Sequence, residues 1–385
     1  MTRTIKNILF FSILAGVLWR CKDTYISPYK SPDTGYLVVE GYITGNGPTQ
    51  FTLSRTVSLS GNGAIPPESN AIVQVEGDDN SLYPLTEQGD GHYGIDTMPL
   101  KTTTKYRLRI KTSNGKEYLS DLVQYKKTPA IDSLNWIFNG SGVKLYVNTH
   151  DPANSTHYYQ WQYNETWEYR SSEYSSYKYL KDSNKVVDRP FSEQIYTCWK
   201  NKASSQIILG NSTKLTQDEI YLQQLDQIPV NTQPLGILFS MQVNQYALTE
   251  DGYNFLTLMQ KNTESLGSIF DAQPSVLKGN IHCLTNPNEQ VVGFVSAGTL
   301  EQKRMFIYAS QVPDWRFYAT CAMPDTVAGL DPASLKLFFG DQSYIPISQH
   351  YPMAGPPDGW TTNLSGCIDC REQGGTTTKP SFWPY

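Results

Sequence analysis

Apolar and polar residues alternate along several short segments in the first third of the chain. A period of two places successive side chains on opposite faces of a strand, so each segment is predicted to form a half-buried β-strand, with polar turns between them. The strand segments are 36–42, 51–57, 71–76, 106–111 and 118–123, with shorter ones around Tyr83 and Tyr93, and the turns are 45–47, 78–80, 89–91 and 113–115. About seven strands at this spacing predict a β-sandwich of the immunoglobulin or fibronectin type III kind, here residues 35–127.

The rest of the chain is predicted to form a larger β-rich domain over residues 130–385, after a linker at 126–129. Strand-like segments at 143–148 and 157–163 flank an Asp-Pro turn. The alternation in this domain is less regular than in the first one. The predicted fold is therefore mainly β, with an N-terminal sandwich followed by a larger β-rich domain.

Two segments of the second domain carry helix signals. Residues 249–261 begin with Thr249 as a cap and end near Lys261, where a cation suits the helix dipole. The segment Thr216-Gln-Asp-Glu219 matches a capping box, so a second, shorter helix is predicted to start there. One or two short helices are therefore expected to pack on the sheets.

Composition supports a β-rich, exported body. Charged residues make up 17% of the chain, below the usual ~25%, and there are 26 tyrosines, which suit a half-buried pleated surface. The formal net charge is -5, with no long basic stretch. Because nucleic-acid binding depends on a basic surface, nucleic acid is excluded as a partner.

The N-terminus has the features of a bacterial lipoprotein export signal. The first six residues carry two cations and no acid, and twelve largely apolar residues follow. This run is too short to span a hydrocarbon core of ~30 Å, which favours a cleaved signal peptide at residues 1–20 over a membrane helix. The segment Leu18-Trp-Arg-Cys21 resembles a lipobox, so Cys21 is the predicted lipidation site and residues 21–34 the anchor and tether. The alternative is an ordinary secreted protein.

Five further cysteines are candidates for disulfide bonds, because an exported protein meets an oxidising environment. An odd number leaves at least one without an intramolecular partner. The two-residue gap in Cys367-Ile-Asp-Cys370 also suits zinc or a redox dithiol, although a zinc site usually needs a second such pair. The candidate disulfide cysteines are Cys198, Cys283, Cys321, Cys367 and Cys370.

Aromatic residues are dense between 158 and 179, and this segment is the candidate surface for a ligand or partner. Aromatic rings bind apolar faces while their polar tips stay hydrated. The alternative is a strand pair that buries alternate rings. On the surface interpretation, a Trp161→Ala, Trp167→Ala double variant loses binding and stays folded. The candidate residues are Tyr159, Trp161, Tyr163, Trp167 and Tyr169.

An enzyme is the rival class of function. The sequence has no nucleophile elbow, zinc-protease helix, phosphate-binding loop or dinucleotide fingerprint. Three acids, Glu165, Glu168 and Glu173, offer a carboxylate pair for glycoside hydrolysis, which requires two acids ~5 to 9.5 Å apart, or are plain surface carboxylates. We expect no catalytic activity, no cofactor and no metal.

Motifs in the last third, together with the chain's end, resemble those of a known family. They are Gly267-Ser-Ile-Phe-Asp-Ala-Gln-Pro274, Lys278-Gly-Asn-Ile-His282, Val291-Val-Gly-Phe-Val-Ser-Ala297, Cys367-Ile-Asp-Cys-Arg371 and Lys379-Pro-Ser-Phe-Trp383. In this order they are similar to an uncharacterised family of Bacteroidota lipoproteins, numbered 4249 among domains of unknown function. The resemblance implies an outer-membrane lipoprotein, often encoded beside a TonB-dependent transporter, with no assigned catalytic residues.

The function expected from the sequence is binding. A β-sandwich body held by a lipid tether at the cell surface suits capture of a ligand or partner as accessory to a TonB-dependent outer-membrane transporter. The alternatives are a structural or assembly component of an envelope complex and, less favoured, a glycan-active hydrolase.

Overall fold

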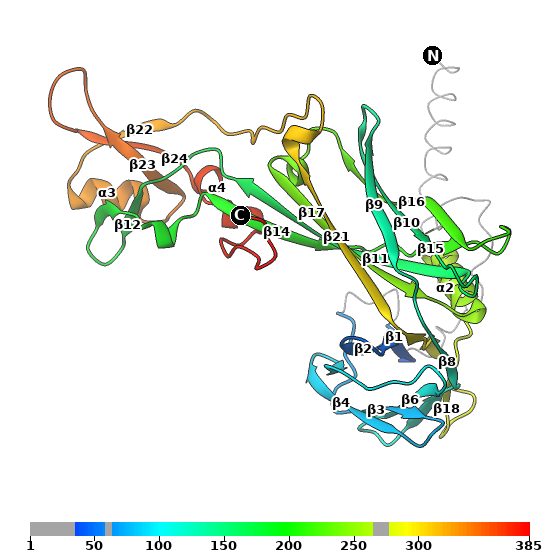
Figure 1. Cartoon of the computed structure of the whole chain (residues 1–385). Coiled ribbons are helices and arrows are strands. Elements are labelled where there is room, and N and C mark those ends of the chain that lie inside the picture. Colours follow the sequence, from blue (N-terminus) through cyan, green and yellow to red (C-terminus); the bar gives the residue numbers. More distant parts are fainter. Residues whose placement is uncertain (1–34, 58–63, 265–276) are drawn as a thin grey trace, which may run out of the picture.

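The computed structural model describes residues 35–57, 64–264 and 277–385. The predicted signal peptide, the lipidation site Cys21 and the tether lie outside these residues, as does the 267–274 motif. The described chain is mainly β with few short helices, which confirms the predicted fold class. It forms two β-sandwiches and a small lobe, and the lobe projects from the end of the second sandwich that is far from the first (Figure 1).

The first sandwich begins with eight strands, and they include all five of the main segments predicted from alternation. Strand β8 pairs with β6, and strands from later in the chain join β1 to β8, so the sheet closes around one core. The strands are β1 (Leu37–Thr44), β2 (Thr49–Arg55), β3 (Ile72–Gly77), β4 (Leu82–Gly89), β5 (His92–Ile95), β6 (Lys105–Lys111), β7 (Glu117–Ser120) and β8 (Val123–Lys126).

Residues 35–127 do not complete this sandwich. Three strands return to it from beyond the second sandwich: β18 (Ile281–Cys283), β19 (Val291–Gly293) and β20 (Ala297–Gly298). Strand β18 pairs with β7, β19 pairs with β1, and β20 pairs with both β1 and β8. A Cβ at Gly293 would lie 2.3 Å from the Val39 carbonyl oxygen, so only glycine allows this close approach. The sequence alone assigns residues 281–298 to the second domain, because alternation reports burial and not the partner of a strand.

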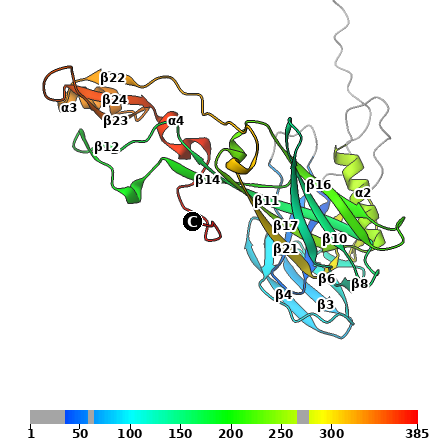
Figure 2. The ribbon, with the colours of Figure 1, turned by 45° about the horizontal axis from the view of Figure 1, so that its top comes forward.

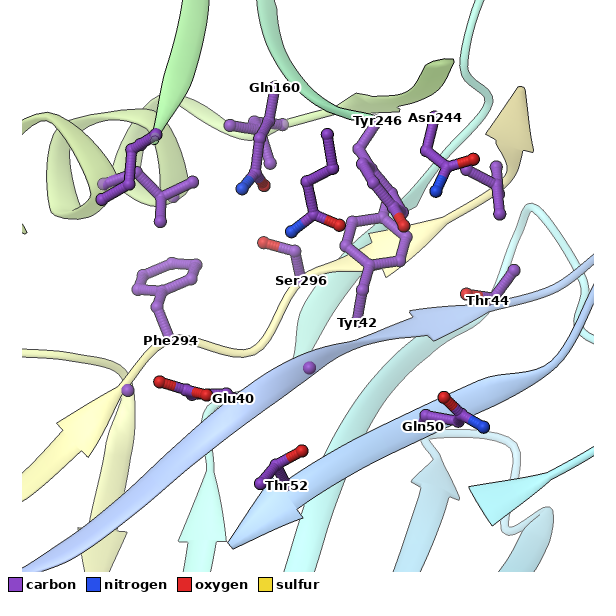
Figure 3. Close-up of a pocket in the computed structure, with 18 of the residues that line it drawn as sticks. Glu40, Tyr42, Thr44, Gln50, Thr52, Gln160, Asn244, Tyr246, Phe294 and Ser296 are labelled. Carbon is purple, nitrogen blue, oxygen red and sulfur yellow. The ribbon is translucent and has the colours of Figure 1, made fainter. Parts of the chain in front are cut away.

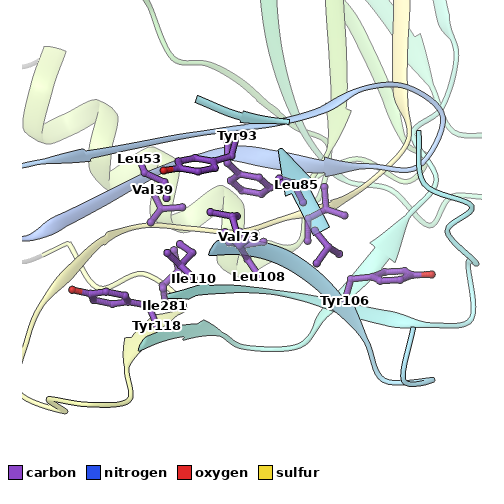
Figure 4. Packing of buried hydrophobic residues seen from close by; sticks show 14 of the residues in the cluster. Val39, Leu53, Val73, Leu85, Tyr93, Tyr106, Leu108, Ile110, Tyr118 and Ile281 are labelled. Carbon is purple, nitrogen blue, oxygen red and sulfur yellow. The ribbon is translucent and has the colours of Figure 1, made fainter. Parts of the chain in front are cut away.

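Alternate residues of these strands fill the core of the first sandwich. Val39, Leu53, Val73 and Leu108 are buried together with Ile281, which comes from the returning segment (Figure 4). Burial of apolar surface is the main favourable term in folding, and it is supplied here by both parts of the chain. The returning strands are therefore part of the core as well as of the sheet.

The second sandwich packs a five-stranded sheet on a three-stranded sheet. The larger sheet has the order β14-β11-β17-β21, with β15 also paired to β11, and the smaller has the order β16-β10-β9. Their inner faces share one hydrophobic core. The strands are β9 (Ile131–Phe138), β10 (Gly142–His150), β11 (Tyr158–Arg170), β14 (Thr197–Ala203), β15 (Ile208–Asn211), β16 (Glu219–Pro229), β17 (Leu238–Ala247) and β21 (Leu300–Tyr308).

The small lobe has its own core around Leu335, Phe339 and Trp360. A two-stranded hairpin and a three-stranded sheet, β22-β24-β23, enclose it with one helix (Figure 2). Its elements are β12 (Tyr177–Leu180), β13 (Lys185–Asp188), β22 (Asp325–Ala328), α3 (Pro332–Phe339), β23 (Tyr344–His350) and β24 (Gly359–Leu364). The remaining short helices are α4 (Ser365–Ile368) and the 3-10 helices η1 (Phe191–Glu193), η2 (Gln233–Leu235), η3 (Ala309–Gln311) and η4 (Cys370–Gln373).

Two disulfides join the segment at the base of the small lobe to other parts of the chain. Cys198 in β14 bonds Cys370 in η4, and Cys321 bonds Cys367 in α4. Cys283, the unpaired cysteine among those described, is buried in the first sandwich. The disulfide prediction is confirmed for four of the five cysteines, and the two thiols of the Cys367 and Cys370 pair belong to different bonds, which rules out a zinc or redox dithiol there.

One of the two predicted helices forms. Helix α2 (Glu250–Glu264) begins after Thr249, whose hydroxyl accepts a hydrogen bond from the Gly252 N–H. The second prediction is wrong, because Glu219 begins strand β16 and the residues around Thr216 form a turn. Apolar residues do follow the box at helical spacing, at Tyr221, Leu225 and Ile228, but the backbone of this segment pairs with β10, and that tertiary pairing outweighs the local helix signal. Among the described residues, no helix has the length and apolar character needed to cross a bilayer.

Candidate functional site

The five candidate aromatic residues lie inside the second sandwich. They belong to strand β11, and their exposed fractions are between 0 and 6%. They point toward the core that the two sheets share, so they do not form a ligand surface, and the prediction that they do is wrong. Alternation on β11 identifies two faces, and the rings occupy the buried one: Tyr159, Trp161, Tyr163, Trp167 and Tyr169.

The polar tips of these rings are satisfied by the protein itself. The Trp161 indole N–H donates to Gln245 at 2.7 Å, and the Tyr159 hydroxyl donates to the buried carboxylate of Asp218. The Tyr169 hydroxyl donates to the Cys370 carbonyl at 2.6 Å. A buried polar group costs free energy unless it is bonded, so these contacts fit structural tyrosines and tryptophans.

The other face of β11 lines a cleft between the two sandwiches. Its cavity volume is about 960 Å³, at the upper end of the ~300–1,000 Å³ range typical of ligand pockets. Strands β1 and β2 form one wall, β11, β17 and β21 form the opposite wall, and α2 closes one end. Figure 3 shows Glu40, Gln50 and Thr52 on the first wall, with Gln160 and Asn244 on the second.

Amide and hydroxyl groups dominate the polar lining, and charge is scarce. Among the described residues of the cleft, Glu40 is the single one with a charged side chain. Side-chain amides carry both donors and acceptors, so they bind neutral polar groups without a counter-charge. The amide residues are Asn46, Gln50, Gln160, Gln162, Gln206, Asn244 and Gln302.

Some of these amides hold the cleft together. Asn46 exchanges two hydrogen bonds with the Leu300 backbone, which joins the first sandwich to β21. The Gln302 amide donates to Asn244 at 2.8 Å. The Tyr42 hydroxyl crosses between the walls and donates to the Ala247 carbonyl at 3.2 Å. The Asn46 and Tyr42 contacts fix the two sandwiches relative to each other, and the Gln302 contact orders the second wall, so the cleft is preformed.

Other amides are free to bind. In the described part of the chain, the side chains of Gln50, Gln160, Gln162 and Gln206 have no hydrogen-bond partner in the protein. They are half-buried or exposed, so water serves them when no ligand is present. Three of these amides lie on the two walls and Gln206 lies in the loop between β14 and β15, so the cleft presents four side-chain amides that can form directional hydrogen bonds.

Aromatic rings line the cleft beside the amides. The rings of Tyr42 and Tyr246 lie 4.8 Å apart between centroids, and those of Phe255 and Phe294 lie 5.6 Å apart. Burial raises the pKa of Tyr42, and the neighbouring Tyr246 raises it further. Burial also raises the pKa of Tyr246. Both hydroxyls therefore stay neutral across the physiological range, and the cleft combines apolar ring surface with uncharged hydrogen-bonding groups.

The amide residues of β11 are a signal in the sequence for the cleft face of this strand, whereas the site predicted from the sequence consists of its aromatic residues. In the run from Tyr159 to Asn164, amides occupy every second position between the rings. A tyrosine or tryptophan suits either a core or a surface, whereas an amide is rarely fully buried. The amides therefore identify the solvent side of the strand, and the rings the inner side.

The three candidate carboxylates do not form a catalytic pair. Glu165 and Glu168 are three positions apart on β11 and so face opposite sides of the sheet. Glu168 is covered by the C-terminal segment, where it accepts hydrogen bonds from the Trp383 indole N–H at 3.1 Å and from the Tyr385 hydroxyl at 2.5 Å. Glu173 lies beyond the strand, in the loop that leads to the small lobe. Among the described residues, no group of three or more His, Cys, Asp or Glu side chains is arranged to hold a metal ion.

Glu165 instead faces the core beside a second acid. Burial and the neighbouring Asp226 raise the pKa of Glu165 to about 8, and Lys202, with its Nζ atom 3.7 Å from the carboxylate, opposes the shift. A carboxyl group whose pKa is higher in the folded state binds its proton more tightly there. Its contribution to stability is complete below the unfolded pKa of about 4.3 and is lost as the pH rises through 8.

We therefore expect Glu165→Gln to flatten the pH dependence of stability. The free energy of unfolding of the native protein should fall between pH 5 and pH 8 relative to that of the variant, because the amide has no proton to lose. Denaturant unfolding of both proteins at each pH unit from 5 to 9 measures the difference. Parallel curves for the two proteins would contradict the raised pKa.

Comparison with known proteins assigns the chain to a family. Among curated proteins, none is similar to it in sequence. The model of the family described as "Domain of unknown function (DUF4249)" matches residues 23–304, which include the first sandwich, the returning strands and most of the second sandwich. Because this match covers well over half of the chain, the protein belongs to the DUF4249 family.

Proposed function

We propose that this protein is a lipid-anchored binding protein of the outer membrane, exposed at the cell surface, that holds a ligand in the cleft between its two sandwiches. The cleft carries the proposal: it is preformed, encloses about 960 Å³ and presents unpaired amides from both walls. Binding rather than catalysis fits this lining. Hydrolysis of a glycosidic bond uses two carboxyl groups, and the described part of the cleft holds one, Glu40.

The proposed partner is a TonB-dependent outer-membrane transporter, for which this protein acts as an accessory. Support comes from the family resemblance and from the lipoprotein-like N-terminus ending at Cys21. A protein tethered beside a transporter raises the local concentration of any ligand that it holds, because the second encounter becomes effectively intramolecular. A preformed binding site on a short tether suits that role.

A structural or assembly role in an envelope complex is the second candidate, and the small lobe favours it. Large apolar side chains are exposed in the lobe and in the segments that connect to it, and exposed apolar surface is typical of protein interfaces. The most exposed, each at least 78% accessible, are Phe191, Tyr318, Met323, Leu337 and Met353. The lobe and the cleft lie in different parts of the molecule, so variants can separate the two functions.

Purification of the tagged protein from native outer membranes in mild detergent tests the partner. We expect a TonB-dependent barrel to co-purify in equal amounts with the native protein. In contrast, Cys21→Ser should move the protein from the membrane fraction to the soluble fraction, since it removes the predicted lipidation site. Mass spectrometry identifies the partner, and the mass of the N-terminal peptide reports lipidation.

The alternatives give different results in the same experiment. Recovery of the protein alone, or with assembly machinery and no transporter, would overturn the accessory role. A Met323→Ser, Met353→Ser variant that loses its partner while the cleft still binds ligand would assign partner binding to the small lobe. Retention of Cys21→Ser in the membrane fraction would contradict the lipid anchor.

A further inference from the structure

The polar groups of the cleft match hydroxyl groups better than charged groups. Gln160 and Gln162 project from β11 with no partner in the described protein, and Gln50 does the same from β2. Each amide offers donors and an acceptor, and each sugar hydroxyl is likewise a donor and an acceptor. Since Glu40 is the single charged side chain in the described lining, an anionic ligand finds no counter-charge there, and a cationic ligand finds one carboxylate at most.

The rings of the cleft suit the apolar faces of sugar rings. Tyr42 and Phe294 are half-buried, so each keeps part of its ring accessible from the cavity. Aromatic side chains supply large, rigid contact area and need only a small loss of conformational freedom. An arrangement of rings beside free amides therefore provides both the stacking and the hydrogen bonds that a carbohydrate chain requires.

The walls of the cleft do not suit a peptide. Strand β1 is paired on both sides, with β2 and with β19 and β20, and β17 is paired on both sides with β11 and β21. An extended peptide binds by adding a strand to an unpaired edge, and a helical peptide needs an apolar groove. The central strands of both walls therefore present faces, and on the edge strand β21 the Lys303 ammonium donates to two backbone carbonyls at the start of β9. The free polar groups on these faces are amides.

We infer that the cleft between the sandwiches is a binding site for a neutral carbohydrate chain, in which Gln50, Gln160 and Gln162 bond the hydroxyls and Tyr42 and Phe294 contact the ring faces. The inference rests on the proposed function of the cleft as the ligand site, and it adds the class of ligand. A volume of about 960 Å³ accommodates more than one sugar ring, so an oligosaccharide is expected to bind more tightly than a monosaccharide.

An array of defined probes tests the inference with the full mature chain. The array holds neutral glucans, mannans, xylans, galactans and N-acetylhexosamine chains, with sulfated and uronic-acid glycans and neutral peptides beside them. We expect binding to at least one neutral class, at least tenfold weaker in the Gln160→Ala, Gln162→Ala double variant. Gln224→Ala is the matched control, because this exposed amide lies on β16 outside the cleft and its loss should change nothing.

The outcomes separate the ligand class from the proposed function. Binding of a charged glycan or a peptide, weakened by the double variant, with no neutral glycan bound, would overturn the carbohydrate inference and retain the cleft as the ligand site. Neutral-glycan binding that the double variant leaves unchanged would move the site elsewhere and overturn both. Unchanged unfolding curves for the variants establish that they are folded, and a folded native protein that binds no probe would also overturn both.

Discussion

Replacing Trp161 with alanine is expected to lower the free energy of unfolding by about 3–5 kcal/mol. Trp161 is completely buried between the two sheets of the second sandwich, where its ring stacks with that of Tyr159 at 5.6 Å between centroids. The truncation leaves a large cavity and deprives the Gln245 amide of the indole N–H that it accepts at 2.7 Å. The cavity and the lost hydrogen bond both lower the free energy of unfolding, because a buried amide without its partner carries a desolvation cost.

Two matched variants identify the cause. Trp161→Phe keeps most of the ring and loses the N–H, so it should lower the free energy of unfolding by about 1–3 kcal/mol. Gln162→Ala, one residue along the strand and on the cleft face, should change it by no more than about 0.5 kcal/mol. Guanidinium unfolding followed by far-UV circular dichroism measures all three. If Trp161→Ala kept native stability and lost ligand binding, the buried structural role of this ring would be contradicted. The aromatic ligand surface predicted from the sequence would then be supported.

Removal of the Cys198–Cys370 disulfide by the double change Cys198→Ala, Cys370→Ala is expected to lower the free energy of unfolding by about 5 kcal/mol. The bond joins residues 172 positions apart, so its loss frees a very long loop in the unfolded chain. The effect is also local. Cys370 is buried in the core of the second sandwich and its carbonyl accepts the Tyr169 hydroxyl, so the C-terminal segment is tied to β11 at this point.

The second disulfide provides the comparison. Cys321 and Cys367 are 46 positions apart, and the same loop relation gives about 4 kcal/mol for the change Cys321→Ala, Cys367→Ala. Unfolding curves of both double variants and the native protein, without reductant, measure the ranking. A Cys198→Ala, Cys370→Ala protein that keeps native stability would show that packing of the C-terminal segment, and not the covalent bond, holds it in place.

The sequence predicted the local structure of this chain well and its long-range pairing poorly. Alternation located the strands of the first sandwich because one face of each strand is buried and the other is not. Helix α2 was predicted because its cap, first-turn acids and apolar residues agree. The capping box at Thr216 has similar local signals, but tertiary pairing with β10 made the following residues a strand, and no local pattern reports that pairing.

The aromatic residues predicted to form the site belong to β11, which also lines the proposed cleft, but they occupy the opposite face of that strand. Both faces of β11 carry residue types that occur on protein surfaces as well as in cores. Alternation separates the two faces but does not show which of them packs against the other sheet. That choice depends on where β10 and β16 pack, which is a property of the whole fold. The opposite wall, on β1 and β2, is more than 100 residues away in the sequence, so no local pattern joins the two.

The returning strands determine the order in which the protein becomes able to fold during synthesis. Until residues 281–298 leave the ribosome, β1 and β7 each expose a sheet edge that those residues later cover. Open edges pair readily with other chains, and contacts between distant residues form slowly. The growing chain therefore keeps these two edges unpaired for most of its length, and a fragment ending at residue 127 is expected to aggregate rather than behave as an independent domain.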